Sequence, residues 1–339
     1  MAAATLCLVC IGGLVTSHGA GMAVPDWPTT FGYNMFFFPI SKWVGGIFYE
    51  HTHRLVASGV GFLTIILAVW LWLKEERRWL RWLGVLALVA VILQGVLGGL
   101  RVTWMKDELG IFHATLAQMF FILICSIALF SSRWWIEGRE PSGNPIQLAV
   151  LRRVSIFGTL LIFCQLVLGA TMRHQHAGLA IPDFPTAYGH LWPAIDPSSV
   201  ARYNQLRAEV TAVNPITGFQ VILQMIHRLG AFAALVVVAT AACFGLRRLH
   251  ANSFARKLSI AWSVLIACQV VLGAATIWTN KSADIATAHV AVGALLFVNG
   301  ALLILVCSRC LWKTAPVEIN LPAGIAHRVA HPRTVEVPA

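Results

Sequence analysis

Apolar segments long enough to cross a membrane recur along the whole chain, and they restrict its fold more than any other feature. A helix needs about 20 predominantly apolar residues to span the hydrocarbon core of a bilayer. The chain is 58% hydrophobic and only 12% charged, whereas soluble domains carry about 25% charged residues. The sequence therefore predicts an all-α integral membrane protein embedded in a lipid bilayer. We expect eight spanning helices, over residues 2–17, 50–73, 80–100, 110–131, 151–171, 218–246, 257–277 and 285–310.

Lys and Arg are distributed unevenly between the connections. The net charge is +11, and the basic residues concentrate around 74–81, 133–153, 247–257 and 309–333. Because basic connections stay on the cytoplasmic side, we expect a multi-pass protein of the cell's inner membrane with both termini cytoplasmic. The long connections 18–49 and 172–217 should then lie outside. The charge is a topological signal, and no nucleic-acid partner is expected. The first apolar segment lacks a charged leader and a cleavage site, so we expect a retained helix.

The two halves of the chain resemble each other. The segment GMAVPDWPTTFG at 21–32 aligns with GLAIPDFPTAYG at 178–189, and QGVLG at 94–98 aligns with QVVLG at 269–273. The extra residues of the second half fall around 196–215. Four helices per half leave both halves in the same orientation. We therefore predict two tandem four-helix bundles related by a pseudo-two-fold axis along the membrane normal.

This repeat divides the chain into four parts. We expect an N-terminal half over 1–131, a cytoplasmic linker over 132–150 and a C-terminal half over 151–312. The Pro-containing tail 313–339 has no apolar period and is expected to be a disordered cytoplasmic segment.

All eight cysteines fall in expected helices. Cys7 with Cys10, and Cys307 with Cys310, have the CxxC spacing of metal and redox sites. In apolar helices, small packing residues are the favoured interpretation.

Four histidines stand near the starts of four expected helices, as two matched pairs. The pair of the first half is His53 and His113, and the pair of the second is His227 and His289. Their helices run in the same direction, so all four should lie near the outer face, and each pair can face inward across its own half. Two imidazoles on facing helices commonly hold haem iron. We therefore predict a haem site in each half.

Two other interpretations of these histidines fit the pattern less well. Unligated helix-end histidines are disfavoured by the matched repetition of the pattern. A metal ion without a porphyrin is disfavoured because nearby Cys, Asp or Glu ligands are scarce.

One carboxylate breaks the symmetry of the two halves. Glu50 precedes His53 by three residues and shares its helix face, whereas the matching position of the second half is Gln224. A carboxylate at the membrane edge is costly unless it is used. We predict a proton-transfer or orienting role for Glu50, and the alternative is a favourable position in the dipole of the helix N-terminus.

Other residues near the histidines have less specific interpretations. Arg54 and Arg228 directly follow His53 and His227, and they could contact haem propionates or lipid headgroups. The Pro-Asp-aromatic-Pro-Thr segments should form loops that cover the sites as lids, with Asp26 and Asp183 capping turns. We expect His51 to be a non-ligand. The outer-loop histidines are expected to be surface residues: His18, His174, His176 and His190.

The combined motif set resembles the haem A synthase family. It consists of Glu50-x-x-His53-Arg54, His113, His227-Arg228 and His289 on a duplicated eight-helix plan, with the paired Pro-Asp loops and Gln-x-x-Leu-Gly segments. The resemblance covers about residues 5–310. It implies an oxidoreductase that oxidises the C8 methyl of haem O to a formyl group by successive hydroxylation. The product, haem A, serves terminal oxidases.

By matching position, the resemblance also implies residue roles. His53 and His113, with Arg54 beside them, would bind the substrate haem O, and Glu50 would be the catalytic carboxylate. His227 and His289 would be the axial ligands of a haem b cofactor, with Arg228 near its propionates. Residues 18–49 contain no cysteine, so the chain resembles the class without the outer-loop cysteine pair.

Alternatives to this function use the same histidines. A quinol-linked di-haem b-type electron carrier would need all four but would not need the difference between Glu50 and Gln224. A haem transporter that holds its cargo transiently is a third alternative. The resemblance leaves open whether the protein docks with a haem O synthase, uses a separate electron-transfer partner or forms a homo-oligomer.

Overall fold

The computed structural model describes residues 1–138, 144–210 and 215–314, and within this part the chain is helical with no β-strands. Seven helices are long and apolar enough to cross a membrane, so the protein is an all-α membrane protein. Their bounds are α2 Gly45–Lys74, α3 Arg78–Thr103, α4 Glu108–Phe130, α6 Pro145–His174, α8 Gly218–Arg248, α9 Phe254–Trp278 and α10 Ala283–Thr314. The first helix, α1 Ala2–Ser17, is apolar but shorter, with 16 residues.

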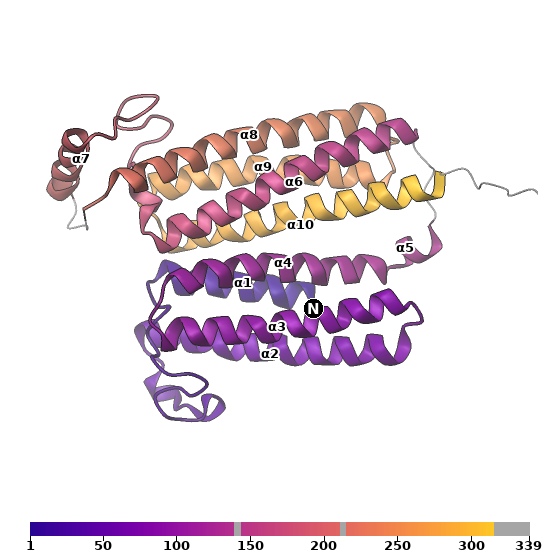
Figure 1. Cartoon of the computed structure of the whole chain (residues 1–339), viewed down its shortest axis with the longest axis horizontal. Coiled ribbons are helices and arrows are strands. Elements are labelled where there is room, and N and C mark those ends of the chain that lie inside the picture. The colour runs from indigo at the N-terminus through magenta and orange to yellow at the C-terminus, as the bar shows by residue number, and fades with distance from the viewer. Residues whose placement is uncertain (139–143, 211–214, 315–339) are drawn as a thin grey trace, which may run out of the picture.

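The long helices and α1 pack as two groups of four (Figure 1). In the first group α1 packs on α2, α2 on α3, α3 on α4 and α4 on α1; in the second, α6 packs on α8, α8 on α9, α9 on α10 and α10 on α6. The two groups meet where α10 contacts α1 and α4, and where α4 contacts α6. The first and fourth helices of each group therefore form the interface, as a two-fold relation of the groups would require.

Apolar side chains are divided between the bundle interior and the surface of the helices. In the second group Trp262 is fully buried among Leu303, Val306 and neighbouring side chains, and its indole N–H donates to the Leu296 carbonyl at 2.9 Å. Large side chains such as Trp70 and Trp82 are instead 65% and 62% exposed. Exposed aromatics on apolar helices are placed to face lipid.

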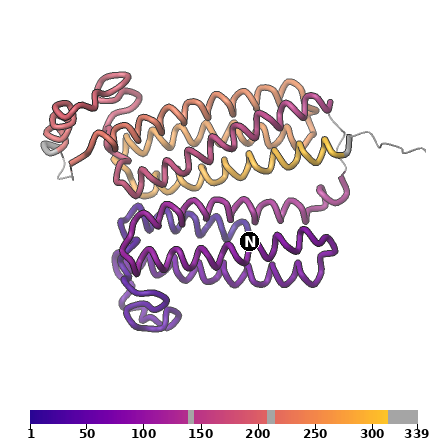
Figure 2. The backbone as a smooth tube through the Cα atoms, viewed as in Figure 1, coloured from indigo at the N-terminus to yellow at the C-terminus, as the bar shows by residue number. Residues whose placement is uncertain are grey.

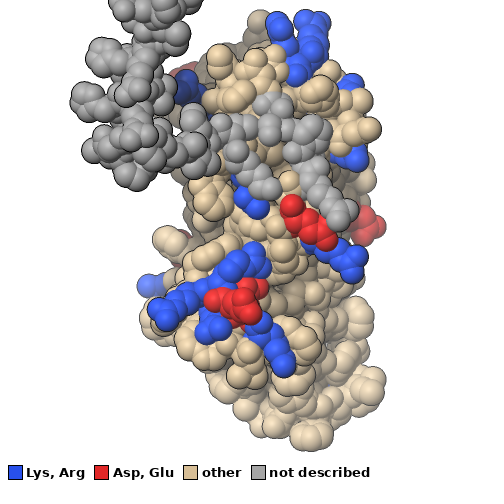
Figure 3. Space-filling view, turned by 90° about the vertical axis from the view of Figure 1, so that its right-hand side faces the viewer, with Lys and Arg blue, Asp and Glu red and all other residues tan. Residues whose placement is uncertain are grey.

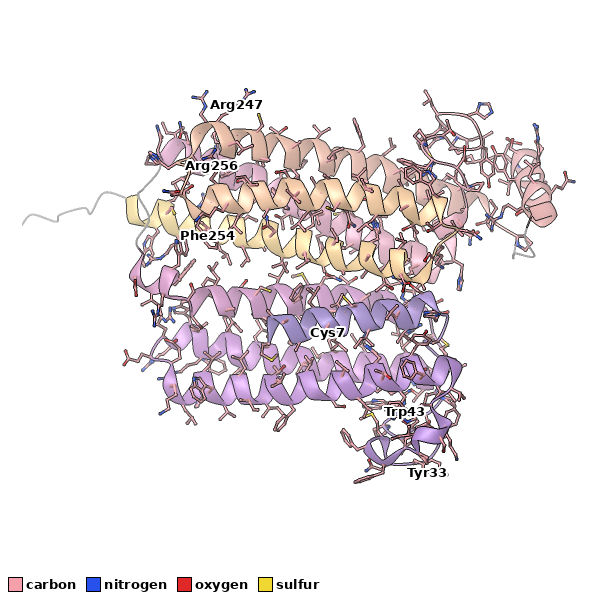
Figure 4. All side chains as sticks on the ribbon, turned by 180° about the vertical axis from the view of Figure 1, so that it is seen from behind. Cys7, Tyr33, Trp43, Arg247, Phe254 and Arg256 are labelled. Atoms are coloured by element: carbon pink, nitrogen blue, oxygen red, sulfur yellow. The ribbon has the colours of Figure 1, made fainter. Side chains whose placement is uncertain are left out.

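Long connections extend from one end of the bundles, which we call the loop end (residues 18–44 and 175–217; Figure 2). The first contains the short 3-10 helices Met35–Phe37 and Ile40–Lys42, and the second contains Ala177–Leu179 and α7 Pro197–Val210. Figure 3 looks onto the opposite end, where Lys and Arg side chains gather. Arg247 and Arg256 lie there (Figure 4). A cytoplasmic location of this end stays a prediction.

The structure differs from the sequence predictions at several helix ends. Helices α2 and α6 begin earlier than expected, at Gly45 and Pro145. In α6 a proline stands at the start of the helix, a position that suits proline. In α2 the residues 45–49 before Glu50 are apolar and extend the helix. The linker contains a short helix, α5 Arg133–Glu137, and α7 occupies the extra length of the second loop. The remainder of the linker, 139–143, and the tail from 315 lie outside the described residues.

Candidate functional site

The first histidine pair joins α2 to α4. The ring centroids of His53 and His113 lie 6.5 Å apart, and their planes are nearly perpendicular, at 81°. Both side chains belong to half-buried residues, and the Nδ1 atom of each is buried with no hydrogen-bond partner in the described part of the chain. The structure thus brings together two residues that are far apart in the sequence, as predicted.

The glycines of neighbouring helices fix the positions of these rings. A Cβ atom on Gly12 of α1 would lie 3.3 Å from Cε1 of His53, and one on Gly98 of α3 would lie 3.3 Å from Cε1 of His113. A side chain at either glycine would therefore push the imidazole. Gln94, one turn before Gly98, donates from Nε2 to the His113 backbone carbonyl at 3.1 Å.

The second histidine pair, His227 on α8 and His289 on α10, is bordered by glycines in the same way. A Cβ atom on Gly169 of α6 would lie 3.5 Å from Cε1 of His227, and one on Gly273 of α9 would lie 3.1 Å from Cε1 of His289. Nδ1 of both rings is again buried and without a partner among the described residues. Nε2 of His289 lies 3.4 Å from Nε2 of Gln269.

These two sites suit a porphyrin-bound iron better than a bare metal ion. No group of three or more His, Cys, Asp or Glu side chains in the described residues is placed to hold a metal ion. Two imidazoles leave a bare ion short of protein ligands, whereas a porphyrin supplies four ring nitrogens to the iron and leaves its two axial positions for the protein. The 6.5 Å separation of the first pair leaves room for two metal–nitrogen bonds of about 2 Å each.

Glu50 holds the loop of the first half onto α2. Its side chain is buried, with 4% of the residue exposed. One carboxylate oxygen accepts from the backbone N–H of Val24 at 2.9 Å, and the other accepts from Nη2 of Arg54 at 2.8 Å. The predicted catalytic role of Glu50 stays a prediction, and the structure adds a structural role that the sequence pattern did not reveal.

Gln224 holds the loop of the second half in the same way. Its Oε1 accepts from the backbone N–H of Ile181 at 2.7 Å, and its Nε2 donates to the Ile181 carbonyl at 3.2 Å. Ile181 is the counterpart of Val24 in the repeated loop segment. An uncharged amide is therefore sufficient for this anchoring contact.

Arg54 and Arg228 reach the same loops from their helices. Arg54 donates to the backbone carbonyls of Val24, Asp26 and Thr29 at 2.7–3.0 Å. Arg228 donates to the carbonyls of Asp183 and Thr186 at 2.7 and 2.8 Å. The sequence pattern did not predict this role of the two arginines as loop anchors. Contact of either arginine with a haem propionate stays a prediction.

The repeated Pro-Asp segments have matching turn structures. Asp26 accepts hydrogen bonds from the N–H groups of Phe31 and Gly32, and Asp183 accepts from those of Tyr188 and Gly189. Gly32 and Gly189 have φ values of 76° and 78°, which glycine adopts readily. Burial raises the pKa of both aspartates, but these bonds and those from Thr29 and Thr186 outweigh it and lower the pKa of each. Both aspartates therefore cap turns, as predicted.

The first loop lies against its helices through aromatic contacts. Trp27 packs so closely on Gly99 of α3 that a Cβ atom there would clash with the indole. His51 is fully buried under this loop, where Nδ1 lies 3.2 Å from Thr30 Oγ1 and the ring packs on Trp43 with centroids 4.7 Å apart. Trp43 and Tyr33 mark the loop in Figure 4. His51 thus anchors the loop.

The outer-loop histidines do not all lie at the surface. His18, His176 and His190 are exposed, as predicted. The prediction for His174 is wrong, because its side chain is only 7% exposed and Nδ1 lies 3.8 Å from Asp107 Oδ1. The reason is that α6 extends to His174 and packs against Gly110 of α4, which has no side chain to displace the ring.

The CxxC-spaced cysteines do not share one environment. Cys307 and Cys310 are buried in the apolar core of the second group. Cys10 is half-buried and Cys7 is exposed on α1 (Figure 4). Their interpretation as packing residues fits the buried pair.

Sequence reasoning missed several residues that touch the histidines. Gly12, Gly169, Gln94 and Gln269 were not connected with the rings, although Gly12 with Gly169 and Gln94 with Gln269 occupy matching positions of the repeat. On α3, Gly98 faces a histidine ring and Gly99 contacts Trp27, whereas Gly95 of α3 and Gly59 and Gly61 of α2 face open space.

Fold and site together define a class: a polytopic helical membrane protein with two histidine pairs suited to haem. Residues 33–300 match the COX15-CtaA family model, described as cytochrome oxidase assembly protein. The chain belongs to this family of cytochrome oxidase assembly proteins.

Individual relatives are similar over most of the chain. It is 26% identical to a protein named heme A synthase from Geobacillus kaustophilus, with 91% of this chain and 90% of the relative covered. It is 27% identical to a protein of the same name from Listeria monocytogenes, with 77% and 78% covered. A third, from Halalkalibacterium halodurans, is 25% identical over 88% of this chain and 91% of the relative.

Proposed function

We propose that this protein is a haem A synthase, which oxidises the C8 methyl group of haem O to a formyl group. The observation that carries the proposal is a pair of matched two-histidine sites of which only the first has a carboxylate beside it. The chain's similarity to proteins named heme A synthase supports the same function.

The first half is the proposed substrate site. His53 and His113 would hold haem O between α2 and α4, with Gly12 and Gly98 leaving space for the imidazoles. The loop that carries Trp27 and Trp43 covers this end of the helices and would exclude water from the reacting edge. We assign Arg54 the role of fixing this loop beside the substrate.

Glu50 is the proposed catalytic carboxylate of this site. Oxidation of a methyl group to an alcohol and then to a hydrated aldehyde breaks C–H bonds. The electrons would pass to the proposed electron-transfer partner, and the protons released require a positioned acceptor. Glu50 lies one turn before His53 on α2, and both its oxygens already act as acceptors, from Val24 and Arg54. Its counterpart Gln224 cannot take up a proton at neutral pH.

The second half is the proposed cofactor site. His227 and His289 would be the axial ligands of haem b, with Gln269 beside His289. Haem b, when bound, supplies one-electron redox chemistry. Gly169 and Gly273 position the imidazoles, and the loop anchored by Gln224 covers the site. An electron-transfer partner and a haem O synthase that delivers substrate are proposed partners.

The test is to produce the protein in membranes that also contain haem O and to identify the haems formed. Haem A or its alcohol precursor in the membranes, absent without the protein, is the expected result. A di-haem electron carrier uses the same histidines but would hold haem b alone and leave haem O unchanged. That outcome would replace the synthase proposal with the carrier.

A further inference from the structure

Two arginines follow glycines that hold imidazole rings, one in each half. Arg101 lies three residues after Gly98 on α3, the glycine that faces His113. Arg173 lies four residues after Gly169 on α6, the glycine that faces His227. Residues three or four apart share a helix face, and both helices run towards the loop end. Each arginine therefore lies about 5 Å further along its helix than the histidine contact.

The arginines occupy different helices in the two halves. We call the four glycines that border the histidine rings the ring-holding glycines. The other two, Gly12 and Gly273, are followed by threonines: Thr16 lies four residues after Gly12, and Thr276 lies three residues after Gly273. The first half thus carries its arginine on its third helix, and the second half carries it on α6, the counterpart of α1. The two sites therefore differ in which helix carries this positive charge, and also in having Glu50 in one half and Gln224 in the other.

Both arginines have buried donors that the protein does not use. Arg101 donates from Nη2 to Asp107 Oδ1 at 3.1 Å, and Arg173 donates from Nη2 to the Gly13 carbonyl at 2.6 Å. Nε of each is buried without a partner within the described residues, and no hydrogen bond there engages either Nη1. Nε is also buried without a partner in Arg228 and several other arginines of the described chain, so the unengaged Nη1 is what distinguishes Arg101 and Arg173. Because a donor without an acceptor is costly, it leaves each of them a terminal nitrogen for an anion.

The surrounding charges also favour an anion. Lys281 lies near Arg173, and burial together with that positive charge lowers the pKa of Lys281. The carboxylate of Asp107 lies beside these cations. Its Oδ1 accepts from Arg101 and lies 3.8 Å from Nδ1 of His174. The group lies at the seam between the halves, because Arg173 also donates to Ser17 of α1.

We infer that Arg101 and Arg173 bind the propionate carboxylates of the two haems, Arg101 in the first half and Arg173 in the second. This inference rests on the proposed function. The planar guanidinium binds carboxylates through paired hydrogen bonds, and both terminal nitrogens, Nη1 and Nη2, of Arg54 and of Arg228 already donate to loop carbonyls. Because the C8 methyl adjoins a propionate-bearing position of the porphyrin, Arg101 would also orient the methyl group that reacts.

The test combines a change in the protein with a change in the haem. Purified full-length protein is loaded with ferric haem b or with its dimethyl ester, which lacks propionate charge, and haem loss to excess apomyoglobin is followed by absorbance. In the wild type, esterification should speed haem loss about tenfold, the effect of one charge-assisted hydrogen bond. Arg101→Met and Arg173→Met should each abolish this difference for one of the two haems. Once the arginine is gone, esterification of the propionate has no contact left to remove, so the two changes are not additive.

Control variants separate charge from folding. Arg202→Met, on an exposed position of α7, removes one loop-end charge and should keep the full effect of esterification. Arg101→Lys and Arg173→Lys retain the charge and should keep part of it, even where the Met variants fold poorly.

Two outcomes would overturn the inference. One is an unchanged rate of haem loss on esterification in the wild type. The other is an equal effect of esterification in the wild type and both Met variants, as expected if the arginines bind phospholipid headgroups instead. If the Met variants lose the effect of esterification but the protein forms no haem A, the two propionate sites are supported and the proposed function fails. Failure of the inference and failure of the proposed function are therefore distinguishable.

Discussion

The loops of the two halves are held by the same geometry with different chemistry. In the first half a carboxylate, Glu50, binds the N–H of Val24 and pairs with Arg54; in the second an amide, Gln224, binds both the N–H and the carbonyl of Ile181. Because the amide does the anchoring in one half, a carboxylate is not needed for anchoring in the other. The anchoring contact therefore does not require the charge of Glu50, which pairs with Arg54 and which we propose takes part in the chemistry.

Substitution of Glu50 by Gln should have the largest effect on this comparison. Gln224 demonstrates that an amide holds such a loop, so Glu50→Gln should keep the fold and bound haem, although the loss of the ion pair with Arg54 should lower the stability of the protein. Loss of a general acid–base group slows a reaction by about 100- to 10,000-fold, and we expect haem A formation to fall by at least about 100-fold. The measurement is haem A formed per protein in membranes that contain haem O.

The matched control is Gln224→Glu, which places a carboxylate in the other half. It should leave haem A formation within a few-fold of the wild type. Full activity of Glu50→Gln would remove the catalytic role from Glu50 and leave it as a loop anchor.

The two loop-anchoring arginines should differ in their contribution to stability. Arg54 and Glu50 form an ion pair whose side chains are 9% and 5% exposed. Removing one partner of a buried pair costs about 3–5 kcal/mol, so Arg54→Met should lower the unfolding temperature strongly. Arg228 has no charged partner in its two carbonyl contacts, and Arg228→Met should cost about 1.5–3 kcal/mol.

Thermal unfolding in detergent measures both variants. Adding Glu50→Gln to Arg54→Met should recover part of the loss, since no charge is then left unpaired. Equal destabilisation by the two single variants, with no recovery in the double variant, would show that the ion pair does not distinguish the halves.

The ring-holding glycines predict a graded response to an added methyl group. Overpacking a tight site costs about 1–3 kcal/mol. A Cβ on Gly273 would lie 3.1 Å from His289, closer than the 3.3 Å at Gly12 and Gly98, whereas the 3.5 Å at Gly169 is an ordinary contact. Gly273→Ala should therefore weaken haem binding most, about tenfold, and Gly169→Ala least.

Haem content per protein measures this, with Gly95→Ala, which faces open space, as the control. A uniform effect at all four positions would contradict the graded contact.

The smallest expected effect concerns the pH response of the loops. Hydrogen bonds lower the pKa of Asp26 and Asp183 below the ordinary value. A lowered pKa in the folded state stabilises the turn above the unfolded pKa, and this is lost as the pH falls through the folded pKa. Both loops should thus stay closed at neutral pH and become susceptible to protease only in acid. Asp26→Asn and Asp183→Asn should both remove the response, and opening of one wild-type loop at neutral pH would contradict the shared turn structure.

Much of the fold could be predicted because membrane helices depend on local apolar length. The helical class and the four histidine positions follow from that length and from the repeat. The helix α7 was missed, because its mixed polar sequence resembles a loop. It is held by a contact between distant segments, in which Tyr203 stacks on Tyr188 with ring centroids 3.6 Å apart.

The site could be predicted only in part, because its details depend on contacts between distant segments. The repeat identified Glu50 and Gln224 as a pair, but not that both hold a loop through residues 26 and 43 positions earlier. The buried position of His174 depends on the absence of a side chain at Gly110 of another helix. A single sequence does not report such tertiary contacts.

The most direct test of the division between the halves identifies the haem that each half holds. His113→Ala and His289→Ala each remove one imidazole from one pair, and the protein is purified from membranes that contain haem O. Haems are then extracted with acidified acetone and identified by chromatography and mass. We predict that His113→Ala retains haem b and loses haem O and its oxidised forms, and that His289→Ala loses haem b and retains haem O. The reverse pattern, or haem b alone in both variants, would contradict it.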